Sequence, residues 1–267
     1  MSLWKTGDLP MMRRFVPTLC LSIAAWLISF VRFLYYVDPI SGFDNGPGIA
    51  VSWIAVFALA AAAVITGCVT IRGIDVTAEM KLSRACGVFF LLGGVAYIIS
   101  AMLLSTKGME SMAAYIISVV SRLFAVLAAA AAGASGIALM RGLTVIKYAY
   151  LNFTVPLFAI ARVLHLYVSG LLNSADTVKA MTFASAIVTA LASLRVFRFI
   201  LTKEGYASSA RASVIALAVC LALGCPSILP MGIRGFGGFA FGNLGDVLIS
   251  SGCFICISSV FEKERKK

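Results

Sequence analysis

Five ionisable residues inside long apolar stretches are the part of this sequence whose chemistry most needs explaining. They are three arginines, the single histidine and one aspartate: Arg32, Arg122, Arg162, His165 and Asp246. A charged side chain at the centre of a membrane span costs about 2.5–3.5 kcal/mol on insertion scales. A residue kept at that cost indicates a bound ligand, an ion pathway or a specific partner inside the protein.

The composition of this set favours an anion as the ligand. Arg162 and His165 are three residues apart, so they share one face of a helix. A guanidinium group binds a carboxylate or a phosphate through two parallel hydrogen bonds. Three arginines against one in-span acid leave an excess of positive charge. We therefore predict a polar, outward-facing cavity that binds an anionic group, with these five residues as its ligand-binding side chains.

A purely structural role is the alternative for each member of the set. The arginines can pair with Asp246, with Asp38, with loop carbonyls or with lipid headgroups, and Arg32 can reach the headgroup layer along its aliphatic stem. His165 alone cannot build a metal site, and a hydrogen-bonded position between helices is the role expected for it. Both interpretations stay open at the level of the sequence.

Signatures of catalysis are missing from the sequence. It contains no H-E-x-x-H, no G-x-S-x-G and no P-loop motif. Cys253 and Cys256 form a C-x-x-C pattern, but they lie within an apolar run and are expected to be packing residues. We therefore assign no catalytic residue, no metal ligand and no cofactor, and the sequence leans away from an enzyme.

The composition indicates that lipid is the main solvent of the chain. Hydrophobic residues make up 61% and charged residues 12% of the 267 positions, whereas a soluble domain carries about 25% charged residues. The net charge of +11 would point to nucleic acid in a soluble protein. Here most Lys and Arg lie in short segments between apolar runs, so we expect no nucleic-acid partner.

Eight stretches are long and apolar enough to cross a bilayer as helices. They are Phe15–Val37, Ile49–Ile71, Leu82–Leu104, Met112–Leu139, Tyr148–Leu171, Val178–Leu201, Ala212–Met231 and Gly242–Phe261. The segments between them are too short to hold a soluble domain. The expected fold is all-α: one polytopic transmembrane bundle over residues 1–267. Between the last two stretches, the Gly- and Phe-rich segment 232–245 is expected to be a flexible connector, with a re-entrant loop as the alternative.

The distribution of basic residues predicts the orientation. With eight spans, sixteen of the 22 Lys and Arg fall on one side, three on the other and three within spans. Positive residues favour the cytoplasmic side. The chain is therefore predicted to be a multi-pass protein of the cell membrane with both termini in the cytoplasm.

A repeat of four spans is a further expectation. A shift of 130 residues aligns the first four stretches with the last four without a gap, and it places Arg32 on Arg162. Four spans per half give both halves the same orientation. We therefore predict two parallel halves, 1–140 and 141–267, related by a rotation about the membrane normal.

One short segment carries a resemblance to other proteins. Asp38-Pro39-Ile40-Ser41-Gly42-Phe43 follows a first span that bears an arginine and ends in aromatic residues. This pattern resembles uncharacterised multi-span membrane proteins of Gram-positive anaerobic bacteria. The resemblance implies a bacterial plasma membrane and nothing about mechanism.

Together these features favour transport or binding of a small, anionic solute as the function. The alternative is a non-catalytic accessory subunit or scaffold that packs against a membrane-protein partner, or against a second copy of itself, through Gly- and Ala-rich faces. In either case the lipid bilayer is the principal partner.

Overall fold

The computed structural model describes residues 13–36, 46, 48–72, 84–104, 112–142, 149–168, 177–202 and 204–259, and all regular structure in these ranges is helical. The long helices are α2 (Val16–Tyr36), α3 (Ile49–Arg72), α4 (Arg84–Leu103), α5 (Met112–Met140), α6 (Thr154–Val168), α7 (Thr177–Thr202), α8 (Tyr206–Val219), α9 (Cys225–Ile233) and α10 (Gly237–Ser258). A 3₁₀ turn, η1 (Ala149–Phe153), precedes α6, and a π turn, η2 (Cys220–Gly224), joins α8 to α9.

These helices form eight apolar membrane-spanning segments, which confirms the all-α fold and the span count. The seventh span is continuous through α8, η2 and α9, from Tyr206 to Ile233, and begins before the predicted start at Ala212. The eighth begins at Gly237 instead of Gly242. The expected connector 232–245 is therefore mostly helix, so that prediction is wrong. The chain is a multi-pass membrane protein.

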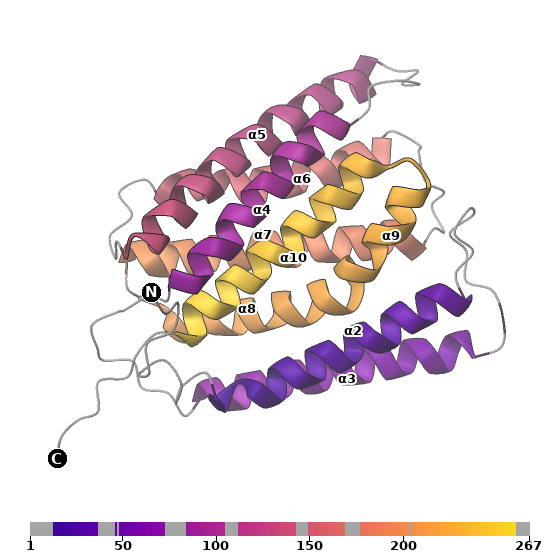
Figure 1. Cartoon of the computed structure of the whole chain (residues 1–267), viewed down its shortest axis with the longest axis vertical. Coiled ribbons are helices and arrows are strands. Elements are labelled where there is room, and N and C mark those ends of the chain that lie inside the picture. The colour runs from indigo at the N-terminus through magenta and orange to yellow at the C-terminus, as the bar shows by residue number, and fades with distance from the viewer. Residues whose placement is uncertain are drawn as a thin grey trace.

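Helix α10 lies at the centre of the bundle and packs against α4, α7, α8 and α9 (Figure 1). The α4–α5 pair covers one side, with α6 packed on α5 and α7. The α2–α3 hairpin lies on the opposite side, where it packs against α8 and η2 (Figure 1). As expected for a central helix, 78% of the most apolar part of α10 is buried, whereas for α3 the share is 22%.

Small residues set the close approach of α4 and α5. A Cβ atom on Gly94 would lie 2.8 Å from the Ala129 carbonyl oxygen, and one on Gly87 would lie 2.5 Å from that of Gly136. The Gly- and Ala-rich run of α5 is thus used within the chain, since several of its alanines, including Ala128 and Ala132, are fully buried. Such contacts gain dispersion energy in a lipid environment, where no hydrophobic effect drives helices together.

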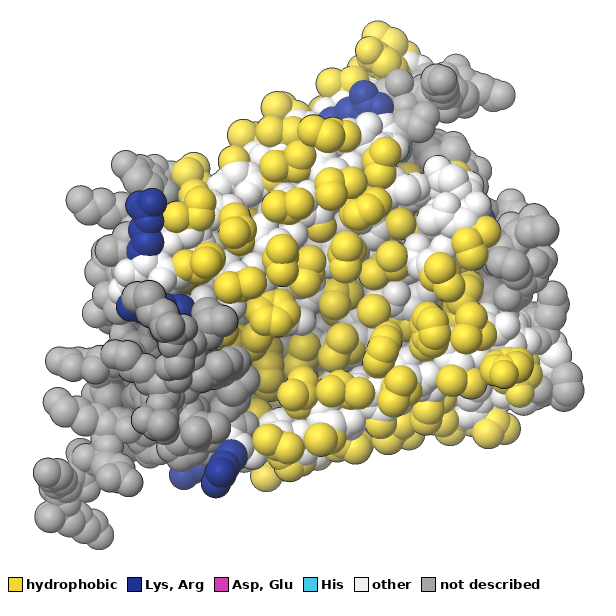
Figure 2. Space-filling model, in the orientation of Figure 1, with side chains coloured by type: hydrophobic (Ala, Val, Ile, Leu, Met, Phe, Trp, Pro, Cys, Tyr) yellow, Lys and Arg dark blue, Asp and Glu magenta, His cyan; other side chains and the backbone are white. Residues whose placement is uncertain are grey.

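The visible outer surface is mainly apolar, and most of its Lys and Arg side chains gather at one end of the bundle (Figure 2). Large side chains such as Val51, Ile54 and Phe57 of α3 are exposed, as expected for helices that face acyl chains. The predicted superposition of halves 1–140 and 141–267 stays a prediction.

Candidate functional site

Two rows of polar side chains face each other in the interior of the bundle. The row on α10 consists of Asn243, Asp246 and Ser250, and the row on α7 consists of Thr182, Ser185 and Thr189. Spacings of three and four residues place each row on a single helix face. All six residues are buried. Packing of α7 against α10 therefore produces a continuous polar seam through the core.

The seam has a charged centre. Arg162 of α6 donates a hydrogen bond through Nη2 to Oδ2 of Asp246 and forms an ion pair with it. The Tyr97 hydroxyl of α4 donates to Oδ1 of the same carboxylate at 2.9 Å. The Arg162 guanidinium also lies 5.5 Å from the ring of Phe158, one turn earlier on α6. Four helices thus meet at Asp246, because the row on α7 closes the remaining side.

The depth of this pair matters for its energetics. Asp246 is nine residues from the start of α10, and Arg162 is six from the end of α6. At about 1.5 Å per residue these positions lie roughly 14 Å and 9 Å from the helix ends, within an apolar layer of about 30 Å. Both side chains are buried. In this environment each charge depends on the other, because an uncompensated buried charge is strongly destabilising.

Glycines on α10 make room for the charged centre. A Cβ atom on Gly242 would overlap the Arg162 guanidinium, and one on Gly245 would overlap the Tyr97 ring. Gly242 and Gly245, within the segment 232–245, are therefore explained by close packing. A flexible loop was expected because glycine is also the commonest residue of turns.

Several buried polar atoms at the centre have no hydrogen-bond partner among the described residues. They are Nε and Nη1 of Arg162, both ring nitrogens of His165 and Oδ1 of Asn243. His165 lies one turn from Arg162 on α6, and its ring packs against Phe239 at 5.2 Å. Buried polar groups are nearly always paired in proteins. These unpaired polar atoms are the clearest indication that a polar ligand belongs here.

Below Asp246 the seam continues as a cluster of two hydroxyl groups and a thiol. Thr189 Oγ1 lies 2.9 Å from Ser250 Oγ and 3.2 Å from Cys220 Sγ, and the last two atoms are 3.3 Å apart. Cys220 begins the π turn η2. Pro226 lacks an N–H group, and its ring crowds the Ala222 carbonyl four residues earlier, so a wider turn at Cys220–Gly224 relieves that contact. Turns of this kind interrupt helices frequently at functional sites.

The other end of the seam is neutral. The Asn243 amide donates to Thr182 Oγ1 at 2.9 Å and to Ser227 Oγ at 2.7 Å. Ser227 belongs to α9, so this amide ties three helices together. It lies about one turn from the ion pair, on the side of the bundle where α10 begins.

The structure brings together three of the five predicted site residues. Arg162 and Asp246 are in contact, and His165 is adjacent on α6. Arg122 of α5 donates to the Leu104 carbonyl at the end of α4. Arg32 lies elsewhere, with its guanidinium 3.7 Å from the Trp53 ring of α3. The hydrogen bond expected for His165 is not found among the described residues.

Sequence reasoning missed the neutral members of the seam, chiefly Tyr97, Ser185 and Thr189. The available signal was their periodicity, because Thr182, Ser185 and Thr189 repeat on one face of a span, as do Asn243, Asp246 and Ser250. Each residue type alone carries little information, since Ser and Thr are common in membrane helices. Two matching rows carry more, because polar faces within lipid must meet each other.

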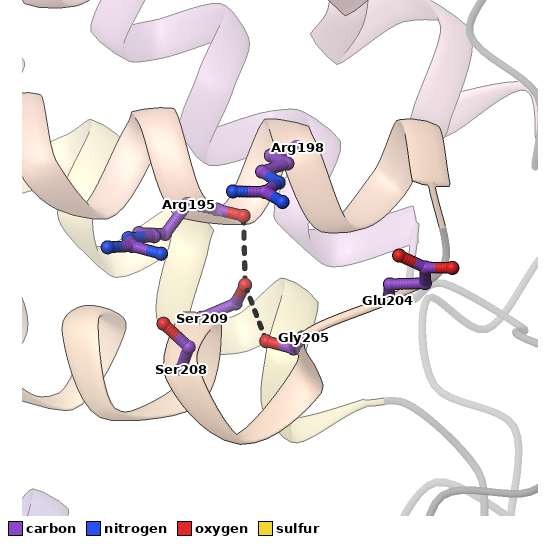
Figure 3. Close-up of a pocket in the computed structure, with 6 residues that line it drawn as sticks. All are labelled: Arg195, Arg198, Glu204, Gly205, Ser208 and Ser209. Carbon is purple, nitrogen blue, oxygen red and sulfur yellow. Dashed lines mark hydrogen bonds between the residues drawn. The ribbon is translucent and has the colours of Figure 1, made fainter.

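A second polar site lies near the junction of α7 and α8, where a pocket of about 250 Å³ is lined by Arg195, Arg198, Glu204, Gly205, Ser208 and Ser209 (Figure 3). Ser209 Oγ donates to the main-chain oxygens of Arg195 at 2.8 Å and Gly205 at 3.1 Å. The carboxylate of Glu204 offsets part of the positive charge. Exposed arginines in this loop are also what the positive-inside rule requires, so the buried seam is the stronger candidate.

The chain was compared with models of protein families, with curated proteins and with solved structures, and none of them matches it. The geometry of the seam is therefore the basis for any assignment of function.

Proposed function

We propose that this protein binds a small anion at Arg162 and carries it across the membrane. Asp246 is the counter-ion of Arg162 when no anion is bound. The anion is a carboxylate or an oxyanion small enough to fit between α6, α7 and α10. On binding it takes the place of the Asp246 carboxylate and also reaches the donors that Asp246 leaves free.

The observation that carries this proposal is the incomplete pairing of Arg162. The side chain is fully buried, yet Nε and Nη1 have no partner among the described residues. A structural arginine at this depth would be expected to satisfy its guanidinium, because each unpaired buried donor costs about 1–3 kcal/mol. A ligand with two oxygens supplies the missing acceptors. The ring nitrogens of His165, one turn away, extend the same donor surface.

Interruptions in the seventh span support transport over simple binding. The Arg162–Asp246 pair is closed off from both sides in this conformation. The π turn η2 and the prolines Pro226 and Pro230 interrupt the helix that packs against the seam. Helices bend at such positions. Bending at η2 would separate α9 from α10 and open a path from the end of the bundle to Asp246.

The accessory-subunit alternative was favoured by Gly- and Ala-rich helix faces that a partner protein would cover. The Gly- and Ala-rich face of α5 is packed against α4 through Gly87 and Gly94. The most exposed helix, α3, presents large apolar side chains such as Phe57 and Ile65. Large side chains suit acyl chains, whereas close helix partners favour small residues.

We further propose that the basic end of the bundle faces the cytoplasm of a bacterial cell, with both termini there. The distribution of Lys and Arg and the resemblance of segment 38–43 support this orientation and location. Reporter fusions after Lys147 and after Lys267 should both signal the cytoplasmic side. An external signal from the second fusion would contradict the proposal.

Thermal unfolding of the detergent-purified protein with a panel of sodium salts tests the proposed function. Lactate, acetate, nitrate and phosphate are suitable probes, with chloride as the reference at equal ionic strength. At least one probe should raise the melting temperature of the wild type, and Arg162→Ala should abolish that rise. Arg195→Ala is the matched control, because it removes an exposed arginine near the second pocket and should keep the rise. No stabilisation by any probe would remove the support for anion binding.

A further inference from the structure

The charge balance at the centre of the seam leads beyond anion binding. With no anion, Arg162 and Asp246 neutralise each other. Arrival of a monovalent anion would leave one negative charge in excess at a fully buried position. Such a charge is too costly to leave uncompensated in the membrane interior. A cation must therefore enter together with the anion.

We propose that this cation is a proton and that Asp246 is its acceptor, so that each anion is transported together with one proton. This inference rests on the proposed function. In the step, the Arg162–Asp246 ion pair breaks, the guanidinium pairs with the anion, and a proton from water binds to the Asp246 carboxylate. The sum of the charges at the site is zero before and after.

Hydrogen bonding around Asp246 suits both forms of the carboxyl group. Tyr97 donates to Oδ1 at 2.9 Å, which serves the ionised form. Ser185 Oγ lies 3.4 Å from Oδ2 and 3.0 Å from the Thr182 carbonyl oxygen. Its single hydrogen can be directed to only one of them, and the Thr182 carbonyl is closer. The Ser185 oxygen is then free to accept a hydrogen bond from protonated Oδ2.

Other groups that face the carboxylate are poorer proton acceptors. Tyr97 approaches from α4 and Cys220 of η2 lies beside Ser185, and a phenol and a thiol are ordinarily already protonated at neutral pH. Arg162 approaches from α6, and its guanidinium has no acceptor atom for a further proton. Ser185 and Thr189 from α7 do not titrate. His165 is the remaining titratable neighbour, and a proton there would add a cation beside Arg162 and Arg122, so Asp246 is the better site.

An alkali cation is a weaker candidate than a proton. The oxygen atoms nearest to the carboxylate belong to two hydroxyl groups, that of Tyr97, which donates to Oδ1 at 2.9 Å, and that of Ser185, which lies 3.4 Å from Oδ2 and directs its hydrogen to the Thr182 carbonyl. Thr189 and Ser250 are engaged with each other and with Cys220. A cation such as Na⁺ requires several converging oxygen acceptors in place of these donors.

Proton uptake on binding is the direct test. Detergent-purified protein in weakly buffered solution is mixed with lactate or nitrate as choline salts, and the bound anion and the pH change are both measured. The wild type should take up about one proton per anion bound. Its affinity should weaken as the pH rises, by up to about tenfold per pH unit, because the bound state holds one proton more than the free state.

Three variants assign the proton. Asp246→Asn should still bind the anion but take up no proton, and its affinity should not depend on pH. Tyr97→Phe removes a donor to the ionised carboxylate and should move the pH at which affinity declines to a higher value. If Asp246→Asn does not fold, this shift in Tyr97→Phe still tests the proposal. His165→Gln should still take up about one proton per anion bound, whatever its affinity for the anion.

The failures are distinguishable. Absence of binding by every probe, with wild type and Arg162→Ala alike, would refute the proposed function and this inference with it. Anion binding that depends on Arg162 but occurs without proton uptake would support the proposed function and refute the proposal of proton coupling. Binding that requires sodium in place of choline, or uptake that is lost only in His165→Gln, would likewise overturn the role of Asp246.

Discussion

Two buried arginines, Arg32 and Arg162, occupy different environments in this molecule. They are 130 residues apart and exposed by only 1% and 0%. Arg32 of α2 lies over the Trp53 ring of α3, within a hairpin at the edge of the bundle. Arg162 pairs with Asp246 at the meeting point of four helices. Burial and residue type are the same, whereas the nature of the partner differs.

The difference bears on which arginine can act on a ligand. A neutral aromatic face stabilises a guanidinium by about 0.5–2 kcal/mol and carries no charge that must be compensated when the contact changes. A carboxylate binds the same group more strongly, but it can be exchanged for another anion of equal charge. Arg162 therefore has a partner that a ligand can replace, and Arg32 has one that fixes it in place.

Removal of Arg162 should have the largest effect of any single change. Arg162→Met leaves the buried Asp246 without its cation, and we expect a loss of about 3–5 kcal/mol in the free energy of unfolding. Arg32→Met should cost clearly less. Thermal unfolding in the same detergent would compare the two variants, and equal losses would contradict the distinction drawn between the two arginines.

A double variant separates the structural part of this effect from the functional part. In Arg162→Met with Asp246→Asn, neither charge is left alone, so most of the stability should return. Stabilisation by an anion should not return. Recovery of both properties would show that the anion site lies elsewhere.

Gly242→Ala should have the next largest effect, because its methyl group would overlap the Arg162 guanidinium. Displacement of that group should cost about 1–3 kcal/mol and weaken anion binding. Gly232→Ala is the matched control, since a Cβ there meets no atom within 4 Å, and it should change stability by less than about 0.5 kcal/mol. Similar melting temperatures for the two variants would mean that Arg162 is not held by α10 as described.

The spans could be predicted from the sequence because lipid requires long apolar helices with internally paired backbones. The two errors have physical causes. Ser208, Ser209 and Arg211 lower the hydropathy at the start of α8, although Ser209 is buried and bonded to the Arg195 carbonyl. The glycines at the start of α10 have the composition of a loop, but they serve helix packing.

The charged site could be predicted only in part. Arg162 and Asp246 stand out in the sequence because a charged residue within a span is costly. Which partner each residue has depends on how α6 and α10 pack. From the sequence alone, Asp38 or a backbone carbonyl was an equally acceptable partner for the arginine. Tyr97 could not be predicted as a site residue for the same reason, because only the packing of the helices places its hydroxyl 2.9 Å from the Asp246 carboxylate. Arg122, equally costly by sequence, donates to the Leu104 carbonyl instead.

The smallest expected effect concerns the aromatic partner of Arg32. Trp53→Leu removes the ring face 3.7 Å from the guanidinium and should cost about 0.5–2 kcal/mol. Trp53→Phe keeps a ring and should recover part of that loss. Neither change should alter anion-induced stabilisation, because the α2–α3 hairpin packs against α8, η2 and α9, whereas Arg162 lies on α6. Thermal unfolding with and without lactate would check both statements, and loss of the lactate effect in Trp53→Leu would connect the two arginines after all.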